Sequence, residues 1–85
     1  MCSCEISVPK GIGLHSKAAT YFINKAKTYK SFIWLKYAGS LVNAKNLFEV
    51  LSLGINGGFF IEILADGVDE EQAIKELANF IENLN

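Results

Sequence analysis

The residues with the clearest chemical potential lie in one short stretch, residues 11–17 (GIGLHSK). It contains the only histidine of the chain, His15, followed by the hydroxyl of Ser16 and the cation of Lys17. Apolar residues then recur at i, i+3, i+4 and i+7, which predicts the core-facing side of a helix of about 12 residues. The members of this stripe are Ala19, Phe22, Ile23 and Ala26. His15 is therefore expected at or beside the N-cap of that helix.

The start of a helix favours bound anions. Its first backbone N–H groups have no intrahelical acceptor, and it is the positive end of the helix dipole. A titratable nucleophile at this point would stand where a phosphate is stabilised. On these residues alone, the alternative is a polar loop residue without such a role, since histidine is not a favoured N-cap residue.

Length and composition restrict the class of protein. A chain of 85 residues forms one domain, and its 51% hydrophobic and 20% charged residues exclude a disordered chain. A net charge of −1 without a basic run argues against a nucleic-acid partner. Because no apolar run approaches the roughly 20 residues of a membrane span and no signal peptide is evident, we expect a soluble, cytoplasmic protein.

The two cysteines, Cys2 and Cys4, do not suggest a metal site. Alternation along a strand would point both thiols to one face. Zinc takes about four ligands, and no other cysteine or second histidine is present to complete a set. We therefore expect reduced thiols, no bound metal and no cofactor.

Periodicity predicts seven elements. Alternating apolar residues predict strands over residues 2–8, 32–37, 40–42 and 59–65, with a tight turn at residues 38–39. Helices are predicted from beside His15 to Ala26 or Lys27, over residues 43–53 before Gly54, and from Asp69 onward. Asp69 and Gln72 have the spacing of a capping box. The pattern predicts a two-layer α+β domain in which helices cover one face of a sheet.

Two groups of apolar residues raise the question of an interface. In the second predicted helix, Leu47, Val50 and Leu51 already supply an inner face, so we expect Phe48 to be largely exposed. Trp34, Phe60 and Leu64 are expected on the sheet face away from the helices. They would form an unusually apolar outer surface, for which weak self-association is a hypothesis.

Four motifs give the chain its family resemblance. They are residues 13–15 (GLH), Gly39 with residues 42–45 (VNAK), residues 51–55 (LSLGI) and residues 67–70 (GVDE). With these motifs in this order, the chain resembles HPr, the histidine-containing phosphocarrier of the bacterial sugar phosphotransferase system. The resemblance covers nearly the whole chain. It implies a single domain over residues 1–85, an open-faced two-layer sandwich with a four-stranded antiparallel sheet and three helices on one face (β-α-β-β-α-β-α).

The resemblance also implies roles for individual residues. His15 corresponds to the histidine that accepts a phosphoryl group on Nδ1 from enzyme I and passes it to the A domains of enzyme II. Lys17, beside Ser16, lies where the family has an arginine that contacts the phosphoryl group. A neutral imidazole can attack phosphorus, and the positive helix end disfavours the imidazolium form.

The docking residues implied by the resemblance lie further along the chain. Leu47 and Phe48 fall on the short helix whose exposed apolar residues enter partner grooves, and Leu51 shares that helix. Gly54 and Ile55 fall on a loop expected close to the histidine and are included among the partner-binding residues.

The chain departs from the family at three positions. Lys17 replaces a planar, two-pronged arginine with a point charge, so phosphoryl contacts should be less fixed in geometry. Ala18 replaces a proline of the first helical turn. Asn46 stands where many members carry a serine that a regulatory kinase phosphorylates, so that switch cannot operate here.

We therefore expect a phosphocarrier without enzymatic activity of its own, a monomer with at most weak self-association. The alternative is a regulatory HPr-like module that docks through Leu47 and Phe48 without efficient phosphoryl transfer. A small enzyme has little support because no second acid, base or metal cluster accompanies His15.

Overall fold

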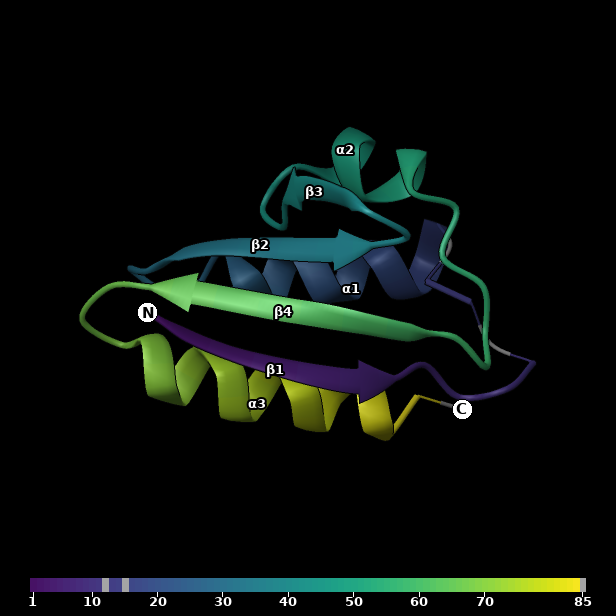
Figure 1. The fold of residues 1–85 in the computed structure, drawn as a ribbon. Helices are drawn as coiled ribbons and strands as arrows, with labels where there is room; N and C mark the ends of the chain where they lie inside the picture. Colours follow the sequence, from purple (N-terminus) through teal and green to yellow (C-terminus); the bar gives the residue numbers. More distant parts are fainter. Residues whose placement is uncertain (12, 15, 85) are drawn as a thin grey trace.

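The computed structural model describes residues 1–11, 13–14 and 16–84, with Ser16 described for its backbone only. Within these residues the elements follow the predicted order (Figure 1). They are β1 (Cys2–Ser7), α1 (Ser16–Ala26), β2 (Phe32–Tyr37), β3 (Ser40–Asn43), α2 (Leu47–Ser52), β4 (Phe60–Asp66) and α3 (Glu70–Glu82).

The strands of the described residues form one antiparallel sheet in the order β1-β4-β2-β3. Strand β4 is therefore internal and pairs with both β1 and β2. Figure 1 looks onto this sheet, with α1 behind it and α3 alongside β1. Helix α2 packs against α1 and β3 at the edge of the sheet. The predicted open-faced, two-layer α+β architecture is confirmed.

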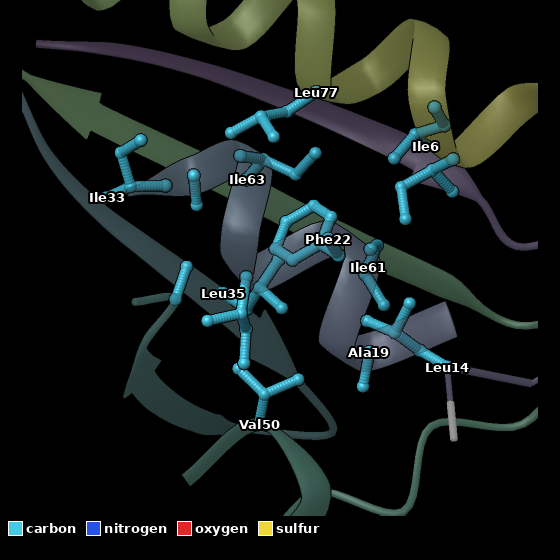
Figure 2. Packing of buried hydrophobic residues seen from close by; sticks show 14 of the residues in the cluster. Ile6, Leu14, Ala19, Phe22, Ile33, Leu35, Val50, Ile61, Ile63 and Leu77 are labelled. Atoms are coloured by element: carbon cyan, nitrogen blue, oxygen red, sulfur yellow. The ribbon is translucent and has the colours of Figure 1, made fainter. Parts of the chain in front are cut away.

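The core lies between the sheet and the long helices. The predicted stripe of α1, Ala19, Phe22, Ile23 and Ala26, is buried as expected. Phe22 points toward Ile61 of β4 and Leu35 of β2 (Figure 2). The buried residues of β4 and β2 alternate with half-buried or exposed ones, as period-two burial requires.

Strand β4 begins one residue later than the predicted strand over residues 59–65. Phe59 precedes the strand, and its side chain is 56% exposed rather than buried. Its ring meets Tyr37 edge-on, with the ring centroids 6.4 Å apart. The carbonyl of Phe59 accepts the N–H of Val8, which lies beyond the end of β1. At this position the helices do not cover the Phe59 side chain.

The second helix is shorter than predicted. Residues 43–46 are not helical, because Asn43 ends β3 and the N–H of Ala44 still donates to the carbonyl of Ile33 at 2.9 Å. Asn46 is the N-cap, and its side-chain oxygen accepts the N–H of Glu49 at 3.1 Å. Asparagine at this point stabilises a helix start and so ends the preceding extended segment. Gly54 follows the helix with a φ of 58°, as predicted for a C-terminal glycine.

The predicted capping box of the last helix is wrong. Asp69 occupies the N-cap position, but its carboxylate makes no cap hydrogen bond. It instead accepts the backbone N–H groups of Lys30 at 2.8 Å and Ser31 at 2.9 Å, and the Ser31 hydroxyl at 2.5 Å. Gln72 donates to Glu76 at 3.2 Å. The loop after α1 thus provides more donors to this carboxylate than the start of its own helix does.

Gly67 lies against the same loop, and this contact generates a stability prediction. A Cβ atom at position 67 would lie 2.6 Å from the Cα and the Oγ of Ser31. Since backbone would have to move, Gly67→Ala should lower the free energy of unfolding by about 1–3 kcal/mol in urea denaturation. Val68→Ala is the matched control, because Val68 is 86% exposed and its truncation should change little. Equal urea midpoints for Gly67→Ala and wild type would contradict this packing.

The Asp69 carboxylate also generates a pH prediction. Hydrogen bonds from the Ser31 hydroxyl, and then from the N–H groups of Lys30 and Ser31, lower the pKa of Asp69 to about 2. Its stabilising effect is therefore complete above the ordinary carboxyl pKa of about 4 and is lost as the pH falls toward 2. Asp69→Asn should lower the melting temperature at pH 7 and approach the wild type near pH 2.

Thermal unfolding followed by circular dichroism between pH 2 and pH 7 measures this difference. Glu71→Gln removes an exposed carboxylate from the same helix and should run parallel to wild type across the range. A constant gap between Asp69→Asn and wild type would show that the charge of Asp69 is not what the loop binds.

Candidate functional site

The predicted anion site would lie at the start of α1. The helix begins at Ser16, the residue that follows His15 in the chain, and its first turn contains no acidic residue. The positive helix end is therefore not offset by a carboxylate within that turn. Lys17 is exposed, and none of the ion pairs between described residues includes it. His15 and the side chain of Ser16 lie outside the described residues, so their roles remain predictions.

The loop after α2 lies against the segment that leads into α1. The backbone N–H of Leu14 donates to the carbonyl of Ile55 at 3.0 Å, and both side chains are buried. Gly54 donates back to Leu51 at 3.1 Å. Gly54 and Ile55 thereby connect the end of α2 to Leu14, the residue immediately before His15. Figure 1 shows these segments at the same end of the molecule.

A second pair of hydrogen bonds holds the loop between β1 and α1. The N–H of Val8 donates to Phe59 at 2.9 Å, and the N–H of Gly58 donates to Val8 at 2.7 Å. Gly58 has a φ of 90°, a conformation that favours glycine, and a Cβ there would touch the stem of Lys10 at 3.4 Å. Residues 8–11 and residues 54–59 therefore form a connected rim beside the start of α1.

Helix α2 presents an apolar surface next to this rim. Phe48 is 82% exposed, which confirms the predicted exposure of this side chain. Leu47 and Leu51 are half-buried, while Val50 is buried and anchors the helix. A phenylalanine exposed to this extent provides a surface that a protein partner can cover.

Comparison with known proteins identifies the family to which this chain belongs. The family model PTS-HPr, described as the PTS HPr component phosphorylation site, matches residues 2–83. The chain belongs to the HPr family. It is 34% identical to the phosphocarrier protein HPr of Haemophilus influenzae over 84 residues, covering 99% of each chain.

Solved structures agree with this assignment. The crystal structure of HPr-C-His from Thermoanaerobacter tengcongensis is 36% identical, with a TM-score of 0.92 over 96% of this chain and 92% of that chain. The crystal structure of an HPr dimer from the same organism has a TM-score of 0.76 at 36% identity, over 96% and 94% of the two chains. The curated relatives of this chain carry the name phosphocarrier protein HPr, which supports a general phosphocarrier role in the phosphotransferase system.

Within this HPr fold, Ile55, which was expected to bind partners, and Asn46, which was expected to have no regulatory role, both have structural tasks. Ile55 is fully buried and its carbonyl accepts the N–H of Leu14, so its expected contact with a partner is wrong, whereas Gly54 is exposed. Asn46 caps α2 through its side-chain oxygen. That cap has a sequence signal, an asparagine followed three residues later by Glu49, which helical periodicity over residues 43–53 obscures.

Other reactive groups of this HPr-family chain do not add a second site. Cys2 and Cys4 are free, and the Cys2 thiol donates to Glu70 at 3.0 Å. That hydrogen bond raises the pKa of Cys2 and so disfavours a nucleophilic thiolate. Among the described residues, no group of three or more His, Cys, Asp or Glu is placed to hold a metal. None of the helices in the described ranges is long and apolar enough to cross a membrane.

Proposed function

We propose that this chain accepts a phosphoryl group on His15 from enzyme I and passes it to enzyme II A domains of the phosphotransferase system. The observation that carries this proposal is the start of α1. The helix begins directly after the only histidine, with an acid-free first turn, in a chain whose HPr match spans residues 2–83. This relay would operate in the cytoplasm.

The proposed transfer needs little machinery beyond position and charge. The Nδ1 lone pair of neutral His15 attacks the phosphorus carried by enzyme I, and a new N–P bond forms. The bond between phosphorus and the donor breaks, and its electron pair leaves with the donor. The same exchange in the second step delivers the phosphoryl group to the enzyme II A domain. Phosphoryl transfer depends mainly on such positioning and on charge stabilisation, much of which the partner can supply.

The residues around His15 would stabilise the charged intermediate only moderately. Phosphorylation adds a group of nearly two negative charges, which backbone N–H groups at the helix start and the ammonium of Lys17 can bind. Lys17 offers a mobile point charge where an arginine would form a planar fork. Moderate binding suits a carrier, because a phosphoryl group bound too tightly would not be released.

The exposed surface of α2 would dock both partners. Phe48, with the half-buried Leu47 and Leu51 beside it, offers an aromatic anchor surrounded by aliphatic side chains. Exposed aromatic residues of this kind often contribute much of the binding free energy of an interface. Its place beside the loop that contacts Leu14 would bring a docked partner to the histidine.

Phosphorylation can be tested by intact-protein mass spectrometry. Incubation with phosphoenolpyruvate and enzyme I should add one acid-labile phosphoryl group, as expected for an N–P bond. His15→Ala should reduce this gain to background. Ser16→Ala is the matched control, because it removes the adjacent hydroxyl and should retain the acid-labile group. An acid-stable phosphate, or one that persists in His15→Ala, would overturn the proposal.

Docking can be tested separately from transfer. Phe48→Ala should raise the dissociation constant for enzyme I about tenfold or more, because it removes the exposed aromatic anchor. Its melting temperature should stay close to that of wild type, since the side chain packs little on its own domain. Phe32→Ala truncates a phenylalanine that is 71% exposed on the sheet and should leave this affinity unchanged. Equal affinities for Phe48→Ala and wild type would exclude α2 as the docking surface.

A regulatory binding module is the second candidate, favoured by Lys17 and Ala18 at positions where the family has arginine and proline. It would share the dependence on Phe48 but show no gain of a phosphoryl group. The two measurements together therefore distinguish a carrier from a module that only docks.

A further inference from the structure

The sheet face turned away from the helices carries an apolar cluster on its two central strands. Phe32 and Trp34 of β2 stack with ring centroids 6.1 Å apart and an interplanar angle of 26°. Leu64 of β4 lies directly opposite Trp34 in the sheet register. Phe32 is largely exposed, while Trp34 and Leu64 are half-buried. Trp34 and Leu64 thus lie on the outer face, as the sequence predicts.

A charged pair lies next to this cluster on the same face. Lys36 of β2 is directly opposite Glu62 of β4. On its other side, Glu62 is opposite Glu5 of β1, so two carboxylates stand side by side. Like charges placed opposite each other across strands are destabilising, and the register partner of Glu5 is Glu62, since β1 is an edge strand that pairs only with β4. The face therefore offers an acidic pair that a cation from a facing molecule would stabilise.

The two cross-strand pairs Trp34–Leu64 and Lys36–Glu62 make the centre of this face complementary to itself. A two-fold axis that runs parallel to the strands, midway between β2 and β4, exchanges these strands between two copies. It places Trp34 of one copy over Leu64 of the other, and Lys36 over Glu62, and it repeats both contacts in reverse. This reciprocity is the requirement for a closed dimer with identical surfaces on both copies. Each lysine would then meet the acidic pair of the facing sheet.

We propose that this open face is a self-association surface on which a second copy of the chain stacks sheet to sheet. Sheets pack face to face about 10 Å apart with strands roughly aligned, and their twist limits close contact to the central strands. The largest exposed apolar patches of monomeric proteins typically measure about 300–600 Å², below the roughly 800 Å² per partner of a standard stable interface. The dimer is therefore weak and depends on concentration. It does not involve His15 or Phe48.

The wild-type protein provides the first measurement. Sedimentation velocity from about 10 µM to about 1 mM should show a shift from one copy to two, as expected for an interface of this size. Trp34 is the only tryptophan of the chain, so its emission should move to shorter wavelength over the same range as its ring is covered. A monomer throughout the range would overturn the proposal.

Charge reversal tests the symmetry of the contact. Lys36→Glu and Glu62→Lys should each remove association, with at least a tenfold rise in the dissociation constant, because each puts like charges against each other twice in the dimer. An equimolar mixture of the two variants should associate again. In the mixed pair, the new carboxylate at position 36 faces the new ammonium at position 62, and the remaining Glu62 faces the remaining Lys36.

Matched variants separate this contact from net charge and from other interfaces. Lys27→Glu and Glu71→Lys change the net charge by the same amounts at exposed positions on the helix side, and each should associate like wild type. Phe48→Ala should also associate like wild type. Far-UV circular dichroism establishes that each variant is folded. Association that survives in Lys36→Glu, or a mixture of Lys36→Glu and Glu62→Lys that stays monomeric, would overturn the proposal.

Discussion

Strand β4 lies between β1 and β2, and its residues Ile61, Ile63 and Ala65 are almost completely buried. Their contact with the helices places α1 and α3 on one side of the sheet (Figure 2). Because side chains alternate along a strand, burying these three residues turns Glu62 and Leu64 to the opposite face. A slip of one residue in register would reverse both faces together. The covered layer and the open face therefore follow from the same constraint.

The position of the candidate site follows from that layer. Phe22 fixes α1 against the sheet, and Leu14 is buried just before the helix begins. The hydrogen bond from Leu14 to Ile55 then brings the end of α2 beside the helix start. Two segments that are distant in sequence, the start of α1 and the end of α2, thus meet at one end of an HPr-family domain. Apolar packing does the positioning, which leaves the helix start and its lysine available for an anion.

Much of the fold was accessible from the sequence because burial has a clear period in these strands and in the two long helices. The errors arose where a side chain had two possible partners. Periodicity extended the second helix back to Asn43, whereas the cap at Asn46 delays its start. Asp69 has the local signature of a capping box, yet it binds a loop 38 residues away, which no local pattern encodes. Local sequence patterns cannot predict whether the Asp69 carboxylate accepts an N–H of its own helix or an N–H that only the tertiary fold brings near.

The candidate site also contains residues whose positions the sequence predicts and residues whose positions it does not. The types and spacing of His15 and Lys17 indicate phosphate chemistry. The family resemblance predicts that the phosphoryl group comes from enzyme I and goes to enzyme II A domains. The exposure of Phe48 could be predicted because the other apolar residues of α2 already filled its inner face. The burial of Ile55 could not, because it depends on the contact with Leu14 across the chain. Loop residues carry no period from which their burial could be read.

The bonds of Asp69 also bear on how the domain opens. They fasten the backbone N–H groups of Lys30 and Ser31, which connect α1 to β2, to the beginning of α3. Helix α3 can therefore detach from the domain only if the N–H groups of Lys30 and Ser31 lose their hydrogen bonds to Asp69 at the same time. Fluctuations of α3 and of the loop become one cooperative event, and amide exchange at Lys30 and Ser31 would report on the opening of a helix to which neither residue belongs.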